Sequence, residues 1–300
     1  MMNIQEPMLR IAVSTRALFD LEKENRIFEE MGAEYYIGYQ KEHEKEVLPK
    51  GPAFQLVEAL LRMSPKVEII LMSKNSAEVS LRIFHSIEAY GLNITKATFT
   101  TGRSIVPYLS AFNTDLYLSA NRDDVAGAVS QGMAAGLIMT DRFHSSSPIS
   151  EIRIAFDGDA VIFSDESEQL FKALGVEAFN QNEHEKALMP LPEGPFAHFL
   201  KTISLLQQEY PFGECPIRTA LVTARCAPAH ERVIRTLRKW GVRIDESFFL
   251  GGLSKTAILQ AFGAHIFFDD SAANIETASS VVLSAMVPYP ADKGIPSKVA

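Results

Sequence analysis

The chain contains one sequence pattern twice. Four pairs of segments match in the same order, the first two pairs displaced by 143 residues and the last two by 150. The pairs are 27–36 with 170–179, 51–63 with 194–206, 67–94 with 217–244, and 101–120 with 251–270. Self-similarity of this kind indicates that one folding unit is repeated. We therefore predict two tandem homologous halves, residues 1–147 and 148–300, joined near the Ser- and Pro-containing stretch 144–151.

Within each half, apolar runs of strand length alternate with helical patterns. In the second half, IRIAF (152–156), RTALVTA (218–224) and AHIFFDD (264–270) have the character of buried parallel strands. Residues 228–241 begin with Pro, end with Gly and place apolar residues at helical spacing, which predicts a helix. The alternation indicates an α/β protein of two doubly wound halves with parallel sheets. The mostly helical segment of about 166–213 is predicted to form a small cap in the second half.

The overall composition excludes several classes of protein. A formal net charge of −8, without runs of Lys and Arg, argues against a nucleic-acid partner. Cys215 and Cys226 form no CxxC pattern, so neither a zinc site nor a disulfide framework is expected. No run approaches the roughly 18 apolar residues of a membrane span, and no signal-peptide core is recognisable. We predict a cytoplasmic protein with no membrane partner; whether it forms a homo-oligomer stays open.

Acidic residues follow two strands of the second half. Asp157 and Asp159 come directly after one strand, and Asp269 and Asp270 end another. Ligands of open α/β sheets bind at the carboxyl ends of the strands. Carboxylates gathered there repel one another unless a cation lies among them, and hard oxygen ligands suit Mg²⁺. We therefore predict a Mg²⁺ site, and not a calcium loop, because Ile162 stands where an EF-hand loop needs Gly.

These residues also suit phosphoryl transfer. A carboxylate such as Asp157 beside Mg²⁺ can attack phosphorus and form an aspartyl-phosphate. Asp159, two residues on, can protonate the leaving oxygen and later activate water. The Thr223 hydroxyl and the Lys255 ammonium can bind the phosphoryl oxygens. The alternative interpretation of DGDAV (157–161) as a solvated turn that caps a helix does not explain why all four motifs occur together.

The order of these motifs resembles a known superfamily. DGDAV, a strand ending in Thr223, then Lys255 and FFDD follow the pattern of the haloacid dehalogenase-like phosphohydrolases. The longer strings IAFDGDAVIFSDESE, ALVTARCAPAHERVIRTLRKWGV and FFLGGLSKTAIL resemble the cytosolic 5'-nucleotidase type I family, over nearly the whole chain. The resemblance implies haloacid dehalogenase-like, Rossmannoid halves. It also implies Mg²⁺-dependent hydrolysis of nucleoside 5'-monophosphates to nucleoside and phosphate through an aspartyl-phosphate.

The resemblance assigns roles to individual residues. These are Asp157 as nucleophile, Asp159 as general acid/base, Thr223, Ala224 and Lys255 as phosphate ligands, and Asp157, Asp159, Asp269 and Asp270 as metal ligands. It does not rank the last two acids as direct metal ligands, and it specifies neither base nor sugar. Two alternatives stay open: a phosphatase for another small phosphomonoester, and a non-catalytic regulator that binds a Mg²⁺-nucleotide.

The first half lacks the acids. At the equivalent positions it has Ser14, Arg16, Ser73, Ile105 and Ser119–Ala120. We expect a half that keeps the fold but not the reaction, and structural support is the first interpretation. The alternatives are that the first half forms a regulatory nucleotide pocket or contributes to the substrate site.

Several neighbouring residues have two interpretations. Arg225 either reaches the substrate or pairs with a surface acid. Ser254 is expected to be a helix N-cap, and Cys226 a small packed residue. Three aromatic residues of the predicted cap are expected to pack in the core and not to stack on a base: Phe179, Phe196 and Phe199.

Overall fold

The computed structural model describes residues 9–140, 149–211 and 213–289, so most of the predicted junction at 144–151 lies outside the described residues. The strands are β1 (Leu9–Ser14), β2 (Val67–Ser73), β3 (Lys96–Phe99), β4 (Leu116–Ser119), β5 (Ala135–Ile138), β6 (Ile152–Phe156), β7 (Ile217–Thr223), β8 (Glu246–Phe249), β9 (Ile266–Asp269) and β10 (Leu283–Met286). The α-helices are α1 (Thr15–Leu18), α2 (Glu22–Glu42), α3 (Phe54–Met63), α4 (Leu81–Ala89), α5 (Val106–Ala111), α6 (Arg122–Ser130), α7 (Glu166–Glu185), α8 (Ala197–Gln207), α9 (His230–Trp240), α10 (Lys255–Phe262) and α11 (Ala272–Ala278), with a 3-10 turn at Ala77–Val79.

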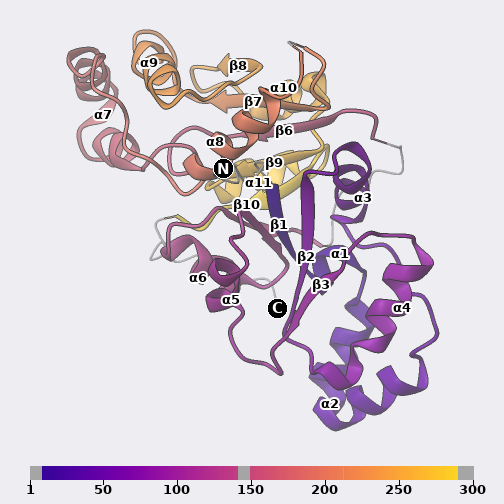
Figure 1. The fold of residues 1–300 in the computed structure, drawn as a ribbon. Helices are drawn as coiled ribbons and strands as arrows, with labels where there is room; N and C mark the ends of the chain where they lie inside the picture. The colour runs from indigo at the N-terminus through magenta and orange to yellow at the C-terminus, as the bar shows by residue number, and fades with distance from the viewer. Residues whose placement is uncertain (1–8, 141–148, 212, 290–300) are drawn as a thin grey trace.

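All ten strands form one sheet, in the order β3-β2-β1-β4-β5-β10-β9-β6-β7-β8 (Figure 1). Each neighbouring pair is parallel except β5 and β10, which are antiparallel. The expected parallel sheets of the two halves are therefore continuous with each other. Pairing β5 with β10 removes two open sheet edges, whose unpaired N–H and C=O groups would otherwise face water.

The strand order is the same around β1 as around β6. Counted within each set of five strands, the first strand lies at the centre, between the second and the fourth. Ile11 pairs with Ile69 and Leu116 on its two sides, and Ile154 pairs with Thr219 and Ile266. Because β5 and β10 run in opposite directions, the carboxyl ends of the two sets of strands lie at opposite edges of the sheet.

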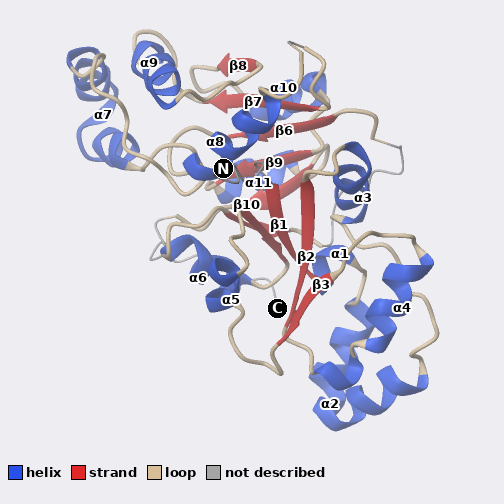
Figure 2. Cartoon of the chain, in the orientation of Figure 1, coloured by secondary structure: helices blue, strands red, loops and turns tan. Residues whose placement is uncertain are grey.

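Helices cover both faces of the sheet, which explains why its strands are apolar at nearly every position (Figure 2). Ala12 and Val13 of β1, and Ala155 and Phe156 of β6, are fully buried. One cluster of buried side chains runs through both halves of the chain. The helix predicted at 228–241 is α9, and Gly241 ends it in the left-handed conformation with φ 67°.

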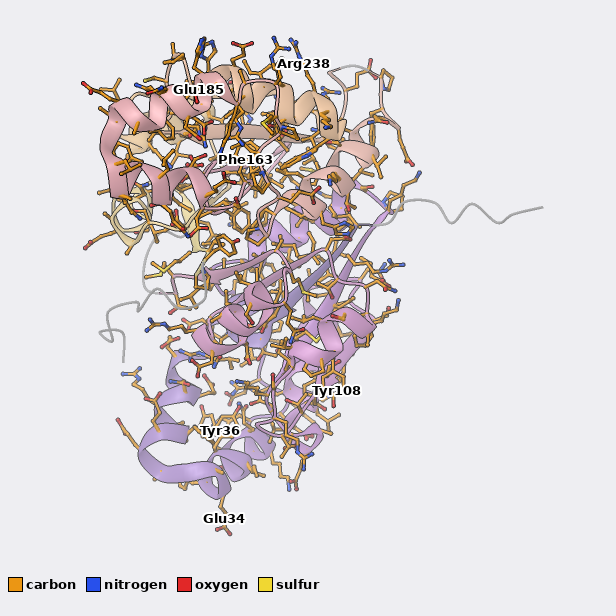
Figure 3. All side chains as sticks on the ribbon, turned by 90° about the vertical axis from the view of Figure 1, so that its left-hand side faces the viewer. Glu34, Tyr36, Tyr108, Phe163, Glu185 and Arg238 are labelled. Carbon is orange, nitrogen blue, oxygen red and sulfur yellow. The ribbon has the colours of Figure 1, made fainter. Side chains whose placement is uncertain are left out.

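Two long helices project from opposite ends of the molecule (Figure 1). Both α2 and α7 are kinked, at Gly32 (φ 82°) and at Gly175 (φ 80°), conformations that glycine adopts without a Cβ clash. After rotation by 90°, Tyr36 of α2 and Glu185 of α7 again lie toward opposite ends (Figure 3). The helix α8, which the sequence pattern placed in the cap of 166–213, instead lies in the core, with Phe199 fully buried.

Candidate active site

Three carboxylates meet at the carboxyl ends of β6 and β9. Because Phe156 pairs with Phe268 across these parallel strands, the next residues, Asp157 and Asp269, are neighbours. One oxygen from each of Asp157, Asp269 and Asp270 lies within 4.8 Å of the others. The backbone N–H of Asp157 donates to the carbonyl of Phe268 at 2.8 Å, which fixes the start of the loop that follows β6. The predicted proximity of Asp157 to the second acidic pair is confirmed.

Lys255 lies among these carboxylates. Its Nζ is 2.7 Å from Asp157 Oδ1 and 2.7 Å from Asp269 Oδ2. The lysine is the first residue of α10, which Ser254 caps by accepting from the backbone N–H of Thr256, as expected. Burial by itself would lower the pKa of Lys255, but the charges of Asp157 and Asp269 outweigh it and raise that pKa above its ordinary value.

Asp269 is the fully buried member of the cluster. One of its oxygens accepts from the backbone N–H of Ser271 at 2.7 Å, and the Asn274 side-chain amide donates to both oxygens at 3.2 and 3.0 Å. Sequence reasoning missed Asn274. The signal available was its place in the first turns of the helix that follows FFDD, where a side chain points back to the strand end.

Lys255 alone does not offset the effects of burial and of Asp269 on the pKa of Asp157. The burial of Asp157, and next the charge of Asp269, raise its pKa to about 7, although Lys255 opposes the shift. Three oxygen donors at this spacing, one from each carboxylate, fit the hard-ligand chemistry of Mg²⁺. The residues present therefore suit the metal that the family resemblance implies.

Asp159 has a different environment from the other predicted metal ligands. Arg225 donates to both of its oxygens, from Nε at 2.8 Å and from Nη2 at 2.7 Å. The side chain of Asp159 thus points to the guanidinium and not into the cluster of three carboxylates. Of the two interpretations of Arg225, pairing with an acid is the one observed, but the acid belongs to the site and the arginine is buried.

A buried glutamate ties this arginine to the projecting helix α7. Glu183 accepts from Arg225 Nη1 at 2.6 Å, from Arg232 Nη1 at 2.8 Å and from Ser167 Oγ at 2.9 Å. Burial acts to raise the pKa of Glu183, but Arg225 and Arg232 together lower it below its usual range. Sequence reasoning missed Glu183; the available signal was the 143-residue displacement, which places another polar residue, Gln40, at the same position of the repeat.

A cavity of about 540 Å³ opens above these residues. Its wall contains most of the residues predicted for the site, together with side chains of α7: Asp157, Asp159, Thr223, Ala224, Lys255, Asp270, Phe171 and Phe179. Asp269 lies beneath it, bonded to Lys255. Thr223 ends β7, and the loop carrying Gly158 passes so close that a Cβ there would lie 3.2 Å from Thr223 Oγ1. The structure brings the predicted residues to one place.

Three expectations about neighbouring residues have different outcomes. Phe196 and Phe199 are fully buried in the core, as expected. Phe179 is only half-buried; it lines the cavity, and the Arg225 guanidinium lies 5.3 Å from the centre of its ring. Cys226 was expected to be packed, but it is exposed at the cavity because the loop after β7 carries it out of the core.

An α/β sheet that gathers carboxylates and a buried lysine at its strand ends, beside a cavity, has the arrangement of the class of open α/β proteins that bind a small ligand there. A family model described as 5'-nucleotidase matches residues 1–294. The chain belongs to the 5'-nucleotidase family of enzymes, which confirms the resemblance to the cytosolic 5'-nucleotidases.

A curated human relative is similar over most of the chain. Cytosolic 5'-nucleotidase 1B of Homo sapiens is 39% identical over an alignment of 286 residues that covers 90% of this chain and 47% of that protein. The chain thus spans about half the length of this relative. Among solved structures, a putative universal stress protein from Pseudomonas aeruginosa UCBPP-PA14 aligns over 94% of both chains at 10% identity, but its TM-score of 0.31 is too low to indicate a shared fold. No helix in the described part of the chain has the length and apolar character needed to cross a membrane.

Proposed function

We propose that this chain hydrolyses nucleoside 5'-monophosphates to nucleoside and inorganic phosphate. The observation that carries the proposal is the cluster of Asp157, Lys255, Asp269 and Asp270 at the floor of the cavity, in a chain of the 5'-nucleotidase family. Carboxylates and a lysine at strand ends suit a phosphoryl group, whereas the motifs themselves do not specify its carrier. We propose a cytoplasmic location, in line with the word cytosolic in the relative's name.

The proposed reaction has two steps. An Asp157 oxygen attacks phosphorus, the bond from phosphorus to the 5'-oxygen breaks, and Asp159 gives its proton to the leaving nucleoside. Asp159 then takes a proton from water, whose oxygen attacks the aspartyl-phosphate, releases phosphate and regenerates Asp157. Lys255, the Thr223 hydroxyl and the backbone at Ala224 hold the phosphoryl oxygens while their charge develops.

Asp159 must be protonated before it can act as an acid. In this structure both of its oxygens accept hydrogen bonds from Arg225. We propose that substrate binding loosens this pair, because a phosphate above Lys255 brings a competing anion to within reach of the same cavity wall. Arg225 would then serve the proton transfer as a positioning residue, held by Glu183.

We propose Mg²⁺ as the metal, held by Asp157, Asp269 and Asp270. When bound, it would neutralise the carboxylates and polarise the phosphoryl group. Asp159 stays a predicted metal ligand, with its side chain paired to Arg225 in this structure. The three acids and Lys255 balance one another only in part, which is the physical reason for expecting a cation here.

We also propose that the chain is a duplicated unit, with a degenerate half at 1–147 and a catalytic half at 148–300. The matching strand order around β1 and β6 supports the duplication. The kinked helix α7, which lines the cavity, would serve as the cap of the catalytic half, while α8 belongs to its core.

Phosphate release from a panel of nucleoside monophosphates and sugar phosphates, with and without Mg²⁺, tests the function. We expect turnover of nucleotides that stops when the metal is chelated. Preferential hydrolysis of sugar phosphates would instead identify a phosphatase for another phosphomonoester. Binding of Mg²⁺ and nucleotide without any phosphate release would identify a regulator and contradict the proposed reaction.

A further inference from the structure

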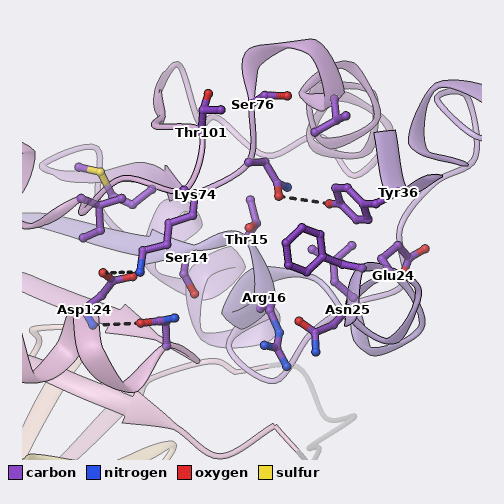
Figure 4. Close-up of a pocket in the computed structure, with 18 of the residues that line it drawn as sticks. Ser14, Thr15, Arg16, Glu24, Asn25, Tyr36, Lys74, Ser76, Thr101 and Asp124 are labelled. Atoms are coloured by element: carbon purple, nitrogen blue, oxygen red, sulfur yellow. Dashed lines mark hydrogen bonds and ion pairs between the residues drawn. The ribbon is translucent and has the colours of Figure 1, made fainter. Parts of the chain in front are cut away.

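The first half contains a cavity of its own, of about 520 Å³. Glu24, Asn25 and Tyr36 of the kinked helix α2 line one side of it (Figure 4). The cavity lies at the carboxyl ends of β1, β2 and β4. This is the place that corresponds, in the proposed duplication, to the catalytic cavity beneath α7. The two cavities have no described lining residue in common, and the antiparallel junction of β5 with β10 puts them at opposite edges of the sheet. No described residue of the first half therefore lines the catalytic cavity.

Both cavities carry an aromatic pair on their kinked helix. Phe28 and Tyr36 of α2 meet edge to face, with ring centres 5.7 Å apart. Phe171 and Phe179 of α7, displaced by 143 residues, meet edge to face at 6.1 Å. Phe28 and Phe171 are similarly exposed, at 50% and 47%. Each cavity thus offers a ring face on which a planar base can stack.

The charged groups differ between the two cavities. Arg16 stands where the catalytic half has Asp159, and Lys74 stands beside Ser73, the counterpart of Thr223. Ser14 replaces the nucleophile. Arg16 thus puts a cation in place of one acid of the catalytic cavity. Glu24 and Asp124, which line the first-half cavity, are paired with Arg82 and Lys74, so a phosphate there needs no metal to offset a cluster of carboxylates.

Arg16 and Lys74 line this cavity and keep N–H groups for a ligand. Arg16 Nη2 contacts Glu22 Oε1 at 2.8 Å, which leaves other N–H groups of the guanidinium for a further acceptor. Lys74 Nζ lies 2.9 Å from Asp124 Oδ1, which engages one of the three N–H groups of the ammonium. An anion in contact with both side chains would accept charge-assisted hydrogen bonds from them.

We infer that the first-half cavity is a second, non-catalytic nucleotide site that works without a metal. Arg16 and Lys74 bind the phosphate oxygens, and the base stacks on Phe28. The choice of a nucleotide over another anion rests on the proposed function of the catalytic half, because the aromatic pair is common to both cavities. Ser14 stands in place of the nucleophile Asp157, and Arg16 stands in place of the proton donor Asp159. The bound nucleotide is therefore not hydrolysed.

Calorimetric titration of the full chain with AMP in excess EDTA tests this site. We expect one metal-independent site, because the acids of the catalytic cavity repel phosphate once the cation is removed. Phe28→Ala should weaken binding about tenfold through loss of base stacking, and Arg16→Gln should weaken it to a similar extent. The matched variant Phe171→Ala should change this affinity less than twofold, and should instead raise KM for Mg²⁺-dependent hydrolysis.

Three outcomes would overturn the inference. The first is that AMP does not bind in EDTA. The second is that Phe171→Ala weakens this binding while Phe28→Ala does not. The third is that adenosine binds as tightly as AMP, which would show that the phosphate contacts contribute nothing to the affinity. Phosphate release with Mg²⁺ is measured separately on the same variants. A chain that binds AMP through Phe28 but hydrolyses nothing would contradict the proposed reaction and leave the second site standing.

Discussion

Removal of Glu183 should strongly destabilise the second half. The carboxylate is fully buried and accepts from Arg225, Arg232 and Ser167. Changing Glu183 to Ala leaves two buried guanidinium groups short of a partner, although Arg225 keeps Asp159. Breaking a buried ion pair by removing one partner costs about 3–5 kcal/mol, and we expect the free energy of unfolding to fall by that amount. Glu183→Gln keeps an acceptor and should cost about 1–3 kcal/mol.

The pH dependence gives this prediction a second readout. The pKa of Glu183 lies below its unfolded value of 4.5, since the folded state favours the charged carboxylate. Its contribution to stability is therefore fully present above about pH 4.5 and is lost as the pH falls through the lower, folded pKa. The difference in unfolding free energy between the wild type and Glu183→Gln should stay constant from pH 7 to pH 5 and shrink at lower pH.

Urea denaturation followed by circular dichroism measures both effects. Glu185→Ala is the control, because Glu185 is exposed on the same helix and contacts Gln181 only at the surface; its change should remain within about 0.5 kcal/mol. If Glu183→Ala lost less than about 1 kcal/mol, or if its loss matched that of the control, the buried ion-pair network would not stabilise the second half as argued.

Three further predictions concern the reaction and the sheet. Asp157→Asn should abolish phosphate release while the circular dichroism spectrum is unchanged, because an amide is a poor nucleophile; retention of more than a few per cent of the wild-type rate would contradict the covalent step. Changing Asp269 and Asp270 together to Asn should raise the Mg²⁺ concentration for half-maximal activity by tenfold or more; an unchanged titration curve would place the metal elsewhere. Gly136→Ala should cost about 1–3 kcal/mol, measured by thermal unfolding, since its Cβ would lie 2.8 Å from a β10 side chain. Gly38→Ala, where nothing lies within 4 Å, is the control and should be neutral or stabilising.

The sequence predicted the gathering of Asp157, Lys255 and Asp269 because parallel neighbouring strands end at one edge of a sheet. Motif order alone places such residues within reach of one another. The same logic did not predict how β5 pairs with β10. Both are short apolar strands, and nothing in their spacing distinguishes an antiparallel junction from two separate sheets.

Contacts between side chains that are distant in the sequence could not be predicted from the sequence either. Glu183 reaches Arg225 because α7 changes direction at Gly175, and the second part of α7 packs against α9. The exposure of Cys226 depends in the same way on the path of one loop. Apolar periodicity predicts the core, as Phe199 illustrates, but it does not distinguish a half-buried aromatic such as Phe179 from a buried one.

The antiparallel junction also has a consequence for how the chain is made. Of the described strands, β10 is the last to be synthesised, and it is the strand that pairs with β5. Until Leu283–Met286 emerges from the ribosome, a nascent first half that has already folded presents β5 with an unpaired edge, the kind of surface that recruits strands from other chains. Translation pauses late in the message, or truncations before residue 283, should therefore favour aggregation far more than truncations of comparable length at a covered surface.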